Sequence, residues 1–172
     1  MADTFTTTNS PLDKYLDDPQ EMVELSRIDP RIIIEIKWAT PNNMLGRAAY
    51  ADNGCFLRRA AAERLSRVQS HLYEKGMGLK IWEGYRPLWM QQLLWNEIGD
   101  HDLVSNPSHG RRTHIRGIAA DVTLVHLNGD EFRMPTAYCE FSKRDQMRHS
   151  WTDLSEEIIQ NRLTLREAME AQ

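Results

Sequence analysis

Residues 113–125 have the sequence THIRGIAADVTLV. The part from Ile118 to Val125 is apolar and contains β-branched residues, which predicts a strand. Asn128-Gly129 follows shortly after and is typical of a two-residue hairpin turn, so residues 131–134 are expected to return beside that strand. The stretch therefore predicts a sheet that is at least partly antiparallel.

The same stretch contains a histidine and an aspartate that are typical metal ligands. His114 and Asp121 are seven positions apart, so an unbroken strand would place them on opposite faces. A turn at Gly117 would allow the two side chains to converge. A hydrolytic zinc takes three protein ligands and leaves one position for a water whose pKa falls to about 7. The spacing alone is more typical of a loop histidine and a surface acid than of a metal site.

The rest of the chain alternates between predicted strands and helices. Hydrophobic periodicity and turn residues predict a strand over residues 31–38, an amphipathic helix over 56–75, a strand over 79–83, a helix that begins at Pro87, and a last helix after a capping box of Asp153 and Glu156. These elements predict an α+β domain with a small central, largely antiparallel sheet flanked by helices. Residues 1–20 are polar and are expected to form a loosely ordered arm, and residues 21–172 a single domain.

Composition narrows the class of partner. The chain has 172 residues, 41% of them hydrophobic, and a net charge of −4 with basic and acidic residues mixed throughout. Such mixing argues against nucleic-acid and membrane partners and favours a small molecule or peptide, whereas the oligomeric state is not predicted. The absence of a secretory signal and of a long apolar run indicates a cytoplasmic protein. The two cysteines, Cys55 and Cys139, are far apart, so a metal would be held by histidine and carboxylates.

A second motif, Glu83-Gly84-Tyr85-Arg86-Pro87, lies at the exit of the predicted strand over residues 79–83. The proline favours an extended backbone at Arg86, which would project the guanidinium from the sheet edge. A guanidinium so placed can hold a substrate carboxylate or stabilise an oxyanion. The alternative is an arginine that forms a structural salt bridge.

Together these motifs resemble the zinc D-alanyl-D-alanine dipeptidases of the vancomycin-resistance type, within the larger group of zinc D-Ala-D-Ala peptidases. The resemblance runs from about Ile28 to the C-terminus and is carried by Trp38-Ala39-Thr40, EGYRP, THIRGIAADVTL and Met134-Pro135-Thr136. It implies that His114 and Asp121 bind Zn²⁺, that Arg86 stabilises the tetrahedral intermediate, and that the substrate is D-Ala-D-Ala or a related D-amino-acid dipeptide.

The chain departs from that family at three places. Members continue past the helix that corresponds to residues 156–170 into a Glu-Trp-Trp-His segment with the general base and third ligand, whereas no Glu-x-x-His occurs here. The resemblance therefore implies a shortened member that binds zinc weakly and hydrolyses D-Ala-D-Ala poorly or not at all. Cys139 stands where the family usually has an aspartate for the substrate amino group, and Arg112-Thr113 replaces serines.

Several alternatives remain open from the sequence. His101, His109 and His149 lie in predicted loops and could supply a third ligand, while His71 and His126 are expected to be structural or surface residues. The chain could also be a non-catalytic relative that binds a peptide or protein. A third hypothesis is a D,D-carboxypeptidase that acts on longer cell-wall peptides, because Cys139 removes the reason to require a free amino terminus.

Overall fold

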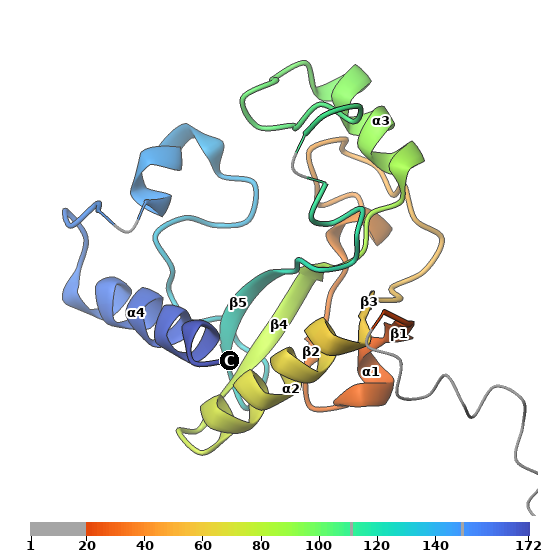
Figure 1. Ribbon diagram of the computed structural model, residues 1–172. Helices are drawn as coiled ribbons and strands as arrows, with labels where there is room; N and C mark the ends of the chain where they lie inside the picture. The colour runs from red at the N-terminus through yellow and green to blue at the C-terminus, as the bar shows by residue number, and fades with distance from the viewer. Residues whose placement is uncertain (1–19, 111, 149) are drawn as a thin grey trace, which may run out of the picture.

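The computed structural model of the chain describes residues 20–110, 112–148 and 150–172 (Figure 1). The predicted N-terminal arm lies outside the described residues, apart from Gln20. The strands are β1 (Met22–Glu24), β2 (Ile33–Ile34), β3 (Phe56–Arg58), β4 (Met77–Glu83) and β5 (Asp121–His126). The helices are α1 (Leu25–Ile28), α2 (Arg59–Tyr73), α3 (Leu88–Ile98) and α4 (Glu156–Glu170), with 3₁₀ helices at Lys37–Ala39 and Phe141–Met147. The predicted α+β class is confirmed.

The larger sheet has three strands in the order β2-β4-β5. β4 is the central strand, and it pairs in parallel with β2 and antiparallel with β5. Ile81 pairs with Val122, but the register then shifts so that Glu83 pairs with Asp121. This irregularity brings two carboxylates together at one end of the β4–β5 pair. A separate two-stranded sheet pairs β1 with β3 antiparallel.

Helix α2 covers one face of the larger sheet (Figure 1). Its buried apolar residues, Leu65, Val68 and Leu72, recur three or four positions apart, as expected for a helix with one core-facing stripe. They belong to the same core cluster as Leu79 and Leu124 of the sheet. The predicted amphipathic helix and the predicted strand before Gly84 are therefore confirmed, and they form the rigid support of the β4–β5 end.

Two predicted elements near the N-terminus differ from the structure. The strand predicted over residues 31–38 is limited to Ile33–Ile34, because Ile36, Lys37 and Trp38 are all buried, which alternation along a strand does not allow. The helix predicted over residues 56–75 begins at Arg59, because Phe56–Arg58 is instead recruited as β3 by its pairing with β1.

The C-terminal half also differs in detail. β5 begins at Asp121 rather than Ile118, and the return of the predicted hairpin is limited to a bridge between Val125 and Glu131. The final helix is capped by Ser155, whose Oγ accepts a hydrogen bond from the Ile158 amide, and not by Asp153. None of the helices in the described part of the chain is long and apolar enough to cross a bilayer.

The side chain of Asp29, which directly follows α1, connects this part of the chain to α2. Its carboxylate is 3% exposed and accepts hydrogen bonds from the Arg31 guanidinium and from the Ser66 hydroxyl of α2. Burial alone would raise the pKa of Asp29, but these hydrogen bonds outweigh it and hold the pKa below its usual value. The resulting stabilisation is complete above the unfolded-state pKa of about 3.9 and is lost as pH falls through the lower folded-state pKa.

We expect Asp29→Asn to lower the free energy of unfolding by roughly 1–3 kcal/mol near neutral pH, because buried donors lose their charged acceptor. The difference from the unmodified protein should shrink as the pH falls below about 4 toward the lowered folded-state pKa, where the native carboxyl itself becomes protonated. Urea unfolding at both pH values measures this, with the exposed Asp102→Asn as control. An equal loss of stability in the two variants would contradict the assigned role.

Candidate metal centre

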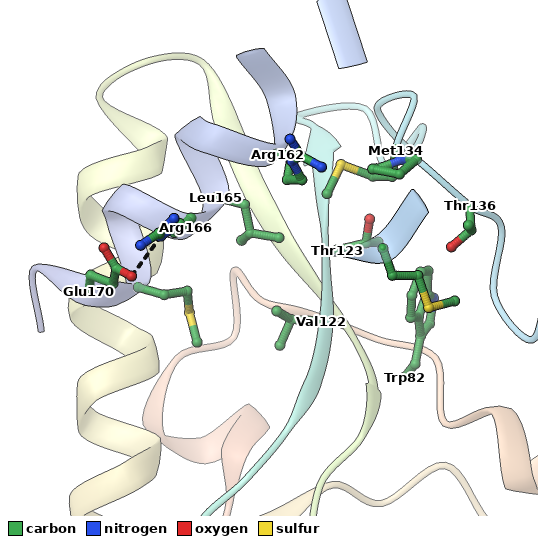
Figure 2. A pocket seen from close by; sticks show the side chains of 12 residues that line it. Trp82, Val122, Thr123, Met134, Thr136, Arg162, Leu165, Arg166 and Glu170 are labelled. Carbon is green, nitrogen blue, oxygen red and sulfur yellow. Dashed lines mark hydrogen bonds and ion pairs between the residues drawn. The ribbon is translucent and has the colours of Figure 1, made fainter. Parts of the chain in front are cut away.

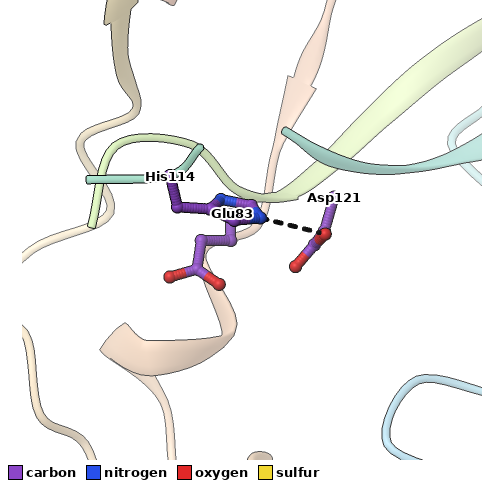
Figure 3. Close-up of side chains that lie close together, drawn as sticks. All are labelled: Glu83, His114 and Asp121. Atoms are coloured by element: carbon purple, nitrogen blue, oxygen red, sulfur yellow. Dashed lines mark ion pairs between the residues drawn. The ribbon is translucent and has the colours of Figure 1, made fainter. Parts of the chain in front are cut away.

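Three potential ligands meet where β4 ends and β5 begins. Glu83 is the last residue of β4, Asp121 is the first residue of β5, and His114 comes from the loop between α3 and β5. Each offers one donor atom, and these atoms all lie within 4.8 Å of one another (Figure 3). Within the part of the chain that the structure describes, no other three His, Cys, Asp or Glu side chains are so arranged.

A turn at residues 113–117 brings His114 toward Asp121. Gly117 has a φ of 70°, and its amide donates to the carbonyl of His114 at 2.9 Å. The Gly117 carbonyl in turn accepts from the Arg58 amide of β3 at 2.8 Å. The turn predicted at Gly117 is therefore present, and β3 holds it in place.

The imidazole of His114 has a fixed orientation. Its Nδ1 lies 2.9 Å from the carbonyl oxygen of Gly84, and since a carbonyl can only accept, Nδ1 carries the proton. Nε2 faces Asp121, with 3.5 Å between Nε2 and Oδ1 (Figure 3). Two ligands of a tetrahedral zinc with bonds of about 2.0–2.2 Å are separated by about 3.4 Å. The pair therefore fits the donor spacing of a zinc site.

His114 and Asp121 each stabilise the charged form of the other. Burial opposes the charged form of His114, but the hydrogen bond and charge of Asp121 outweigh it and raise the pKa of His114. Burial likewise acts to raise the pKa of Asp121, but His114 and Arg86 hold the pKa of that carboxyl below its usual value. Asp121 is therefore an anion at neutral pH and a suitable partner for a cation.

Glu83 joins this group to Arg86. The Glu83 side chain is 1% exposed, and both of its oxygens accept hydrogen bonds from Arg86, with 2.6 Å between Nε and Oε1. Arg86 Nη1 also donates to Gln91 Oε1 at 2.7 Å, and Gln91 is held by the carbonyl of Ser105. Burial alone would lower the pKa of Arg86, but Glu83 raises it, so the guanidinium remains charged.

A cavity of about 290 Å³ opens in front of these groups, close to the lower end of the range of about 300–1,000 Å³ for small-molecule sites. Glu83, Arg86, His114, Asp121 and Cys139 all contribute to its lining. A larger groove of about 460 Å³ lies between α4 and β5 and is lined by Trp82 and other residues, none of which belongs to the metal group (Figure 2).

Trp82 and Glu83 are neighbours on a strand and point to opposite faces of the sheet. The groove and the site are therefore separate.

The structure brings all three predicted site residues, Arg86, His114 and Asp121, to one cavity. The other histidines that were considered as a third ligand do not line this cavity. His101 stacks on Trp95 with 3.7 Å between ring centroids, and His109 is exposed. His149 lies outside the described residues.

Glu83 was missed by the sequence-based reasoning. The sequence pattern could have identified it. Alternation along the strand places Glu83 on the same buried face as Ile81, and an acid at a core-facing position needs a partner.

Residues 18–172 match the family described as D-Ala-D-Ala dipeptidase. The chain belongs to this family. Its members are metallopeptidases, so the protein is a peptidase of the hydrolase class and a small dipeptide is the substrate its relatives imply.

Similar proteins carry the same description. The D-alanyl-D-alanine dipeptidase of Escherichia coli (strain K12) is 32% identical over 134 residues, which cover 78% of this chain and 69% of the relative. That of Enterococcus faecalis is 26% identical over 156 residues, which cover 80% of this chain and 77% of the relative. That of Streptomyces coelicolor is 29% identical over 116 residues, which cover 56% of this chain and 57% of the relative.

Gly117→Ala tests whether the turn positions His114. A Cβ at Gly117 would lie 2.8 Å from the sulfur of Met22, whereas a Cβ at Gly99, which has the same φ of 70°, would meet nothing within 4 Å. We expect Gly99→Ala to cost only the left-handed backbone penalty, about 1–2 kcal/mol. Gly117→Ala should carry a similar backbone penalty, because the end of the Met22 side chain can shift, but it should also weaken the binding of added Zn²⁺.

Chemical unfolding and zinc titration of the two variants measure these effects. Equal zinc affinity in both variants would mean that the turn does not position His114.

Proposed function

We propose that this protein hydrolyses D-alanyl-D-alanine, or a related D-amino-acid dipeptide, with a zinc ion held by His114 and Asp121. The observation that carries the proposal is the 3.5 Å approach of His114 Nε2 to Asp121, with Nδ1 engaged by the Gly84 carbonyl and Arg86 beside them. The proposal is further supported by the relatives, which are described as D-alanyl-D-alanine dipeptidases. We also propose that the protein is located in the cytoplasm and that its substrate derives from the cell wall.

The donor set favours zinc over harder cations. Imidazole with carboxylate oxygen suits zinc, whereas calcium and magnesium prefer oxygen ligands alone. We assign the third position to Glu83, the remaining donor within 4.8 Å. A carboxylate has about four lone-pair sites, so Glu83 can bind a metal and still hold Arg86. The sequence predicted only His114 and Asp121 as ligands, and Glu83 is the third group that we add to them.

The chain's own residues provide binding and charge stabilisation. When bound, zinc supplies a Lewis acid that activates water at neutral pH. Arg86 uses three of its five N–H groups within the protein, which leaves two for the oxygen of a peptide carbonyl. Because the Arg86 side chain is only 15% exposed, these donors act where water screens them little. Glu83 and Gln91 keep the guanidinium in position.

The metal assignment predicts one zinc per chain. We expect His114→Ala and Asp121→Asn each to lower zinc affinity by about 100-fold or more, and Glu83→Gln to lower it by about 10- to 100-fold. Isothermal titration with Zn²⁺ measures this. His126→Ala is the matched control, because His126 stacks on Phe132 away from the cavity and should leave affinity unchanged. Undiminished affinity in the His114 and Asp121 variants would refute the assignment.

The role of Arg86 is tested separately from metal binding. Arg86→Lys keeps the charge but loses the planar set of donors, so we expect D-Ala-D-Ala hydrolysis to fall by about 100- to 1,000-fold. Zinc affinity should change much less, because Arg86 is not a ligand. Steady-state assays of D-alanine release, combined with the zinc titration, measure both quantities. Zinc binding without any turnover in the unmodified chain would instead favour a non-catalytic, peptide-binding relative.

A further inference from the structure

One wall of the cavity at the metal centre is formed by the loop over residues 37–50. Two residues of this loop, Trp38 and Met44, line the same cavity as Arg86 and His114. The Trp38 side chain is buried, and its indole N–H has no hydrogen-bond acceptor among the described residues. The position of this wall therefore depends on how the rest of the loop is held.

Asn43 holds the loop together through its side chain. Its Nδ2 lies 3.1 Å from the carbonyl oxygen of Lys37, 2.6 Å from that of Thr40 and 2.9 Å from that of Arg47. Its Oδ1 accepts a hydrogen bond from the Leu45 amide at 2.8 Å. A side-chain amide has two N–H donors and one acceptor oxygen, so Asn43 uses both ends of its amide to fold this segment.

The two ends of the loop meet at Trp38. Its carbonyl accepts hydrogen bonds from the amides of Ala49 and Tyr50, at 2.7 and 2.9 Å. The Tyr50 ring packs edge-on against Trp89 of α3, with 5.9 Å between ring centroids. The loop is thereby joined to the helix that contributes Leu94 to the cavity lining.

The middle of the loop reaches a second segment of the cavity lining. Burial raises the pKa of the Cys139 thiol, whereas the Met44 backbone amide acts to lower it, so the two groups lie close together. Cys139 lines the cavity together with Tyr138 and Phe141. The loop therefore connects two parts of the lining that are far apart in sequence.

The groups that carry the chemistry in the proposed function are held by other parts of the chain. The His114 imidazole is oriented by the Gly84 carbonyl, and the Arg86 guanidinium is held by Glu83. Among the described residues, none of these hydrogen bonds involves the loop. A change in the loop can therefore alter the cavity wall without moving the donor atoms.

We propose that Asn43 is a positioning residue for the reaction, and that it holds the loop so that Trp38 and Met44 close the cavity around a bound peptide. The inference rests on the proposed function and assigns substrate affinity and bond chemistry to different parts of the chain. An apolar wall contacts the ground state and the transition state alike. Loss of its position should therefore raise KM and leave kcat nearly unchanged.

The principal variant is Asn43→Asp, which keeps the shape of the side chain but replaces the N–H donors by an oxygen that would face carbonyl oxygens. We expect the KM for D-Ala-D-Ala to rise about tenfold and kcat to change by less than about twofold. Zinc affinity should not change, because none of the proposed ligands is bonded to the loop. Steady-state assays and zinc titration measure these quantities.

Hydrogen exchange provides a readout that does not depend on activity. In Asn43→Asp the amides of Leu45, Ala49 and Tyr50 should exchange about tenfold faster, because the loop opens more often. The amides of β4 should exchange as they do in the unmodified chain. Local acceleration would show that the variant loosens this wall and not the whole fold.

Asn42→Asp is the matched control. Asn42 is exposed, and its side chain forms no hydrogen bond within the described part of the chain, so the same substitution there should change neither KM nor exchange. Circular dichroism establishes that each variant is folded. If Asn43→Asp does not fold, Asn43→Ala takes its place, because it removes the donors without adding a charge, and the same direction of change is expected.

The outcomes distinguish this inference from the proposed function. Faster exchange in the loop with a higher KM, in the Asn43 variant alone, supports the inference. Unchanged exchange, an unchanged KM, or a lower kcat at unchanged KM overturns it.

If the unmodified chain binds no zinc or does not hydrolyse the dipeptide, the proposed function fails, and calorimetry with D-Ala-D-Ala decides the inference. Binding that is about tenfold weaker in the Asn43 variant then supports it. Equal binding, or no binding to either chain, overturns it.

Discussion

The site depends on the buried ion pair between Glu83 and Arg86. A carboxylate that is 1% exposed would be strongly destabilising without a partner, and removal of one member of such a pair typically costs about 3–5 kcal/mol. The pair also fixes the segment between its members. The Gly84 carbonyl accepts from His114 Nδ1, and the Arg86 amide donates to the His114 carbonyl. One ion pair thus holds the guanidinium, the strand exit and the histidine together.

The sheet gives this pair its rigid support and separates two environments. Alternation along β4 directs Glu83 to the metal centre and Trp82 to the groove beside α4. The close approach of β3 requires a glycine at position 84, since a Cβ there would lie 2.8 Å from both the Cys55 sulfur and the Phe56 carbonyl. Packing and chemistry are therefore set by the same few residues.

Reaction class and substrate class come from different parts of the site. The imidazole, the carboxylates and the guanidinium decide which bond chemistry is possible, because they carry the donor atoms and the charge. Most of the other residues that line the cavity are apolar, so they offer a bound molecule contacts rather than charge.

Local sequence patterns determined the helix α2, the strand β4 and the turn at Gly117, because periodicity and turn residues act over a few positions. They also identified His114, Asp121 and Arg86 as candidates. Only the tertiary structure decided that Glu83 joins them, since the register shift between β4 and β5 is set by long-range pairing. The same holds for the cavity lining, which includes Cys139 but not the adjacent Glu140, because residues far apart in sequence become neighbours only when the strands pair and the core closes.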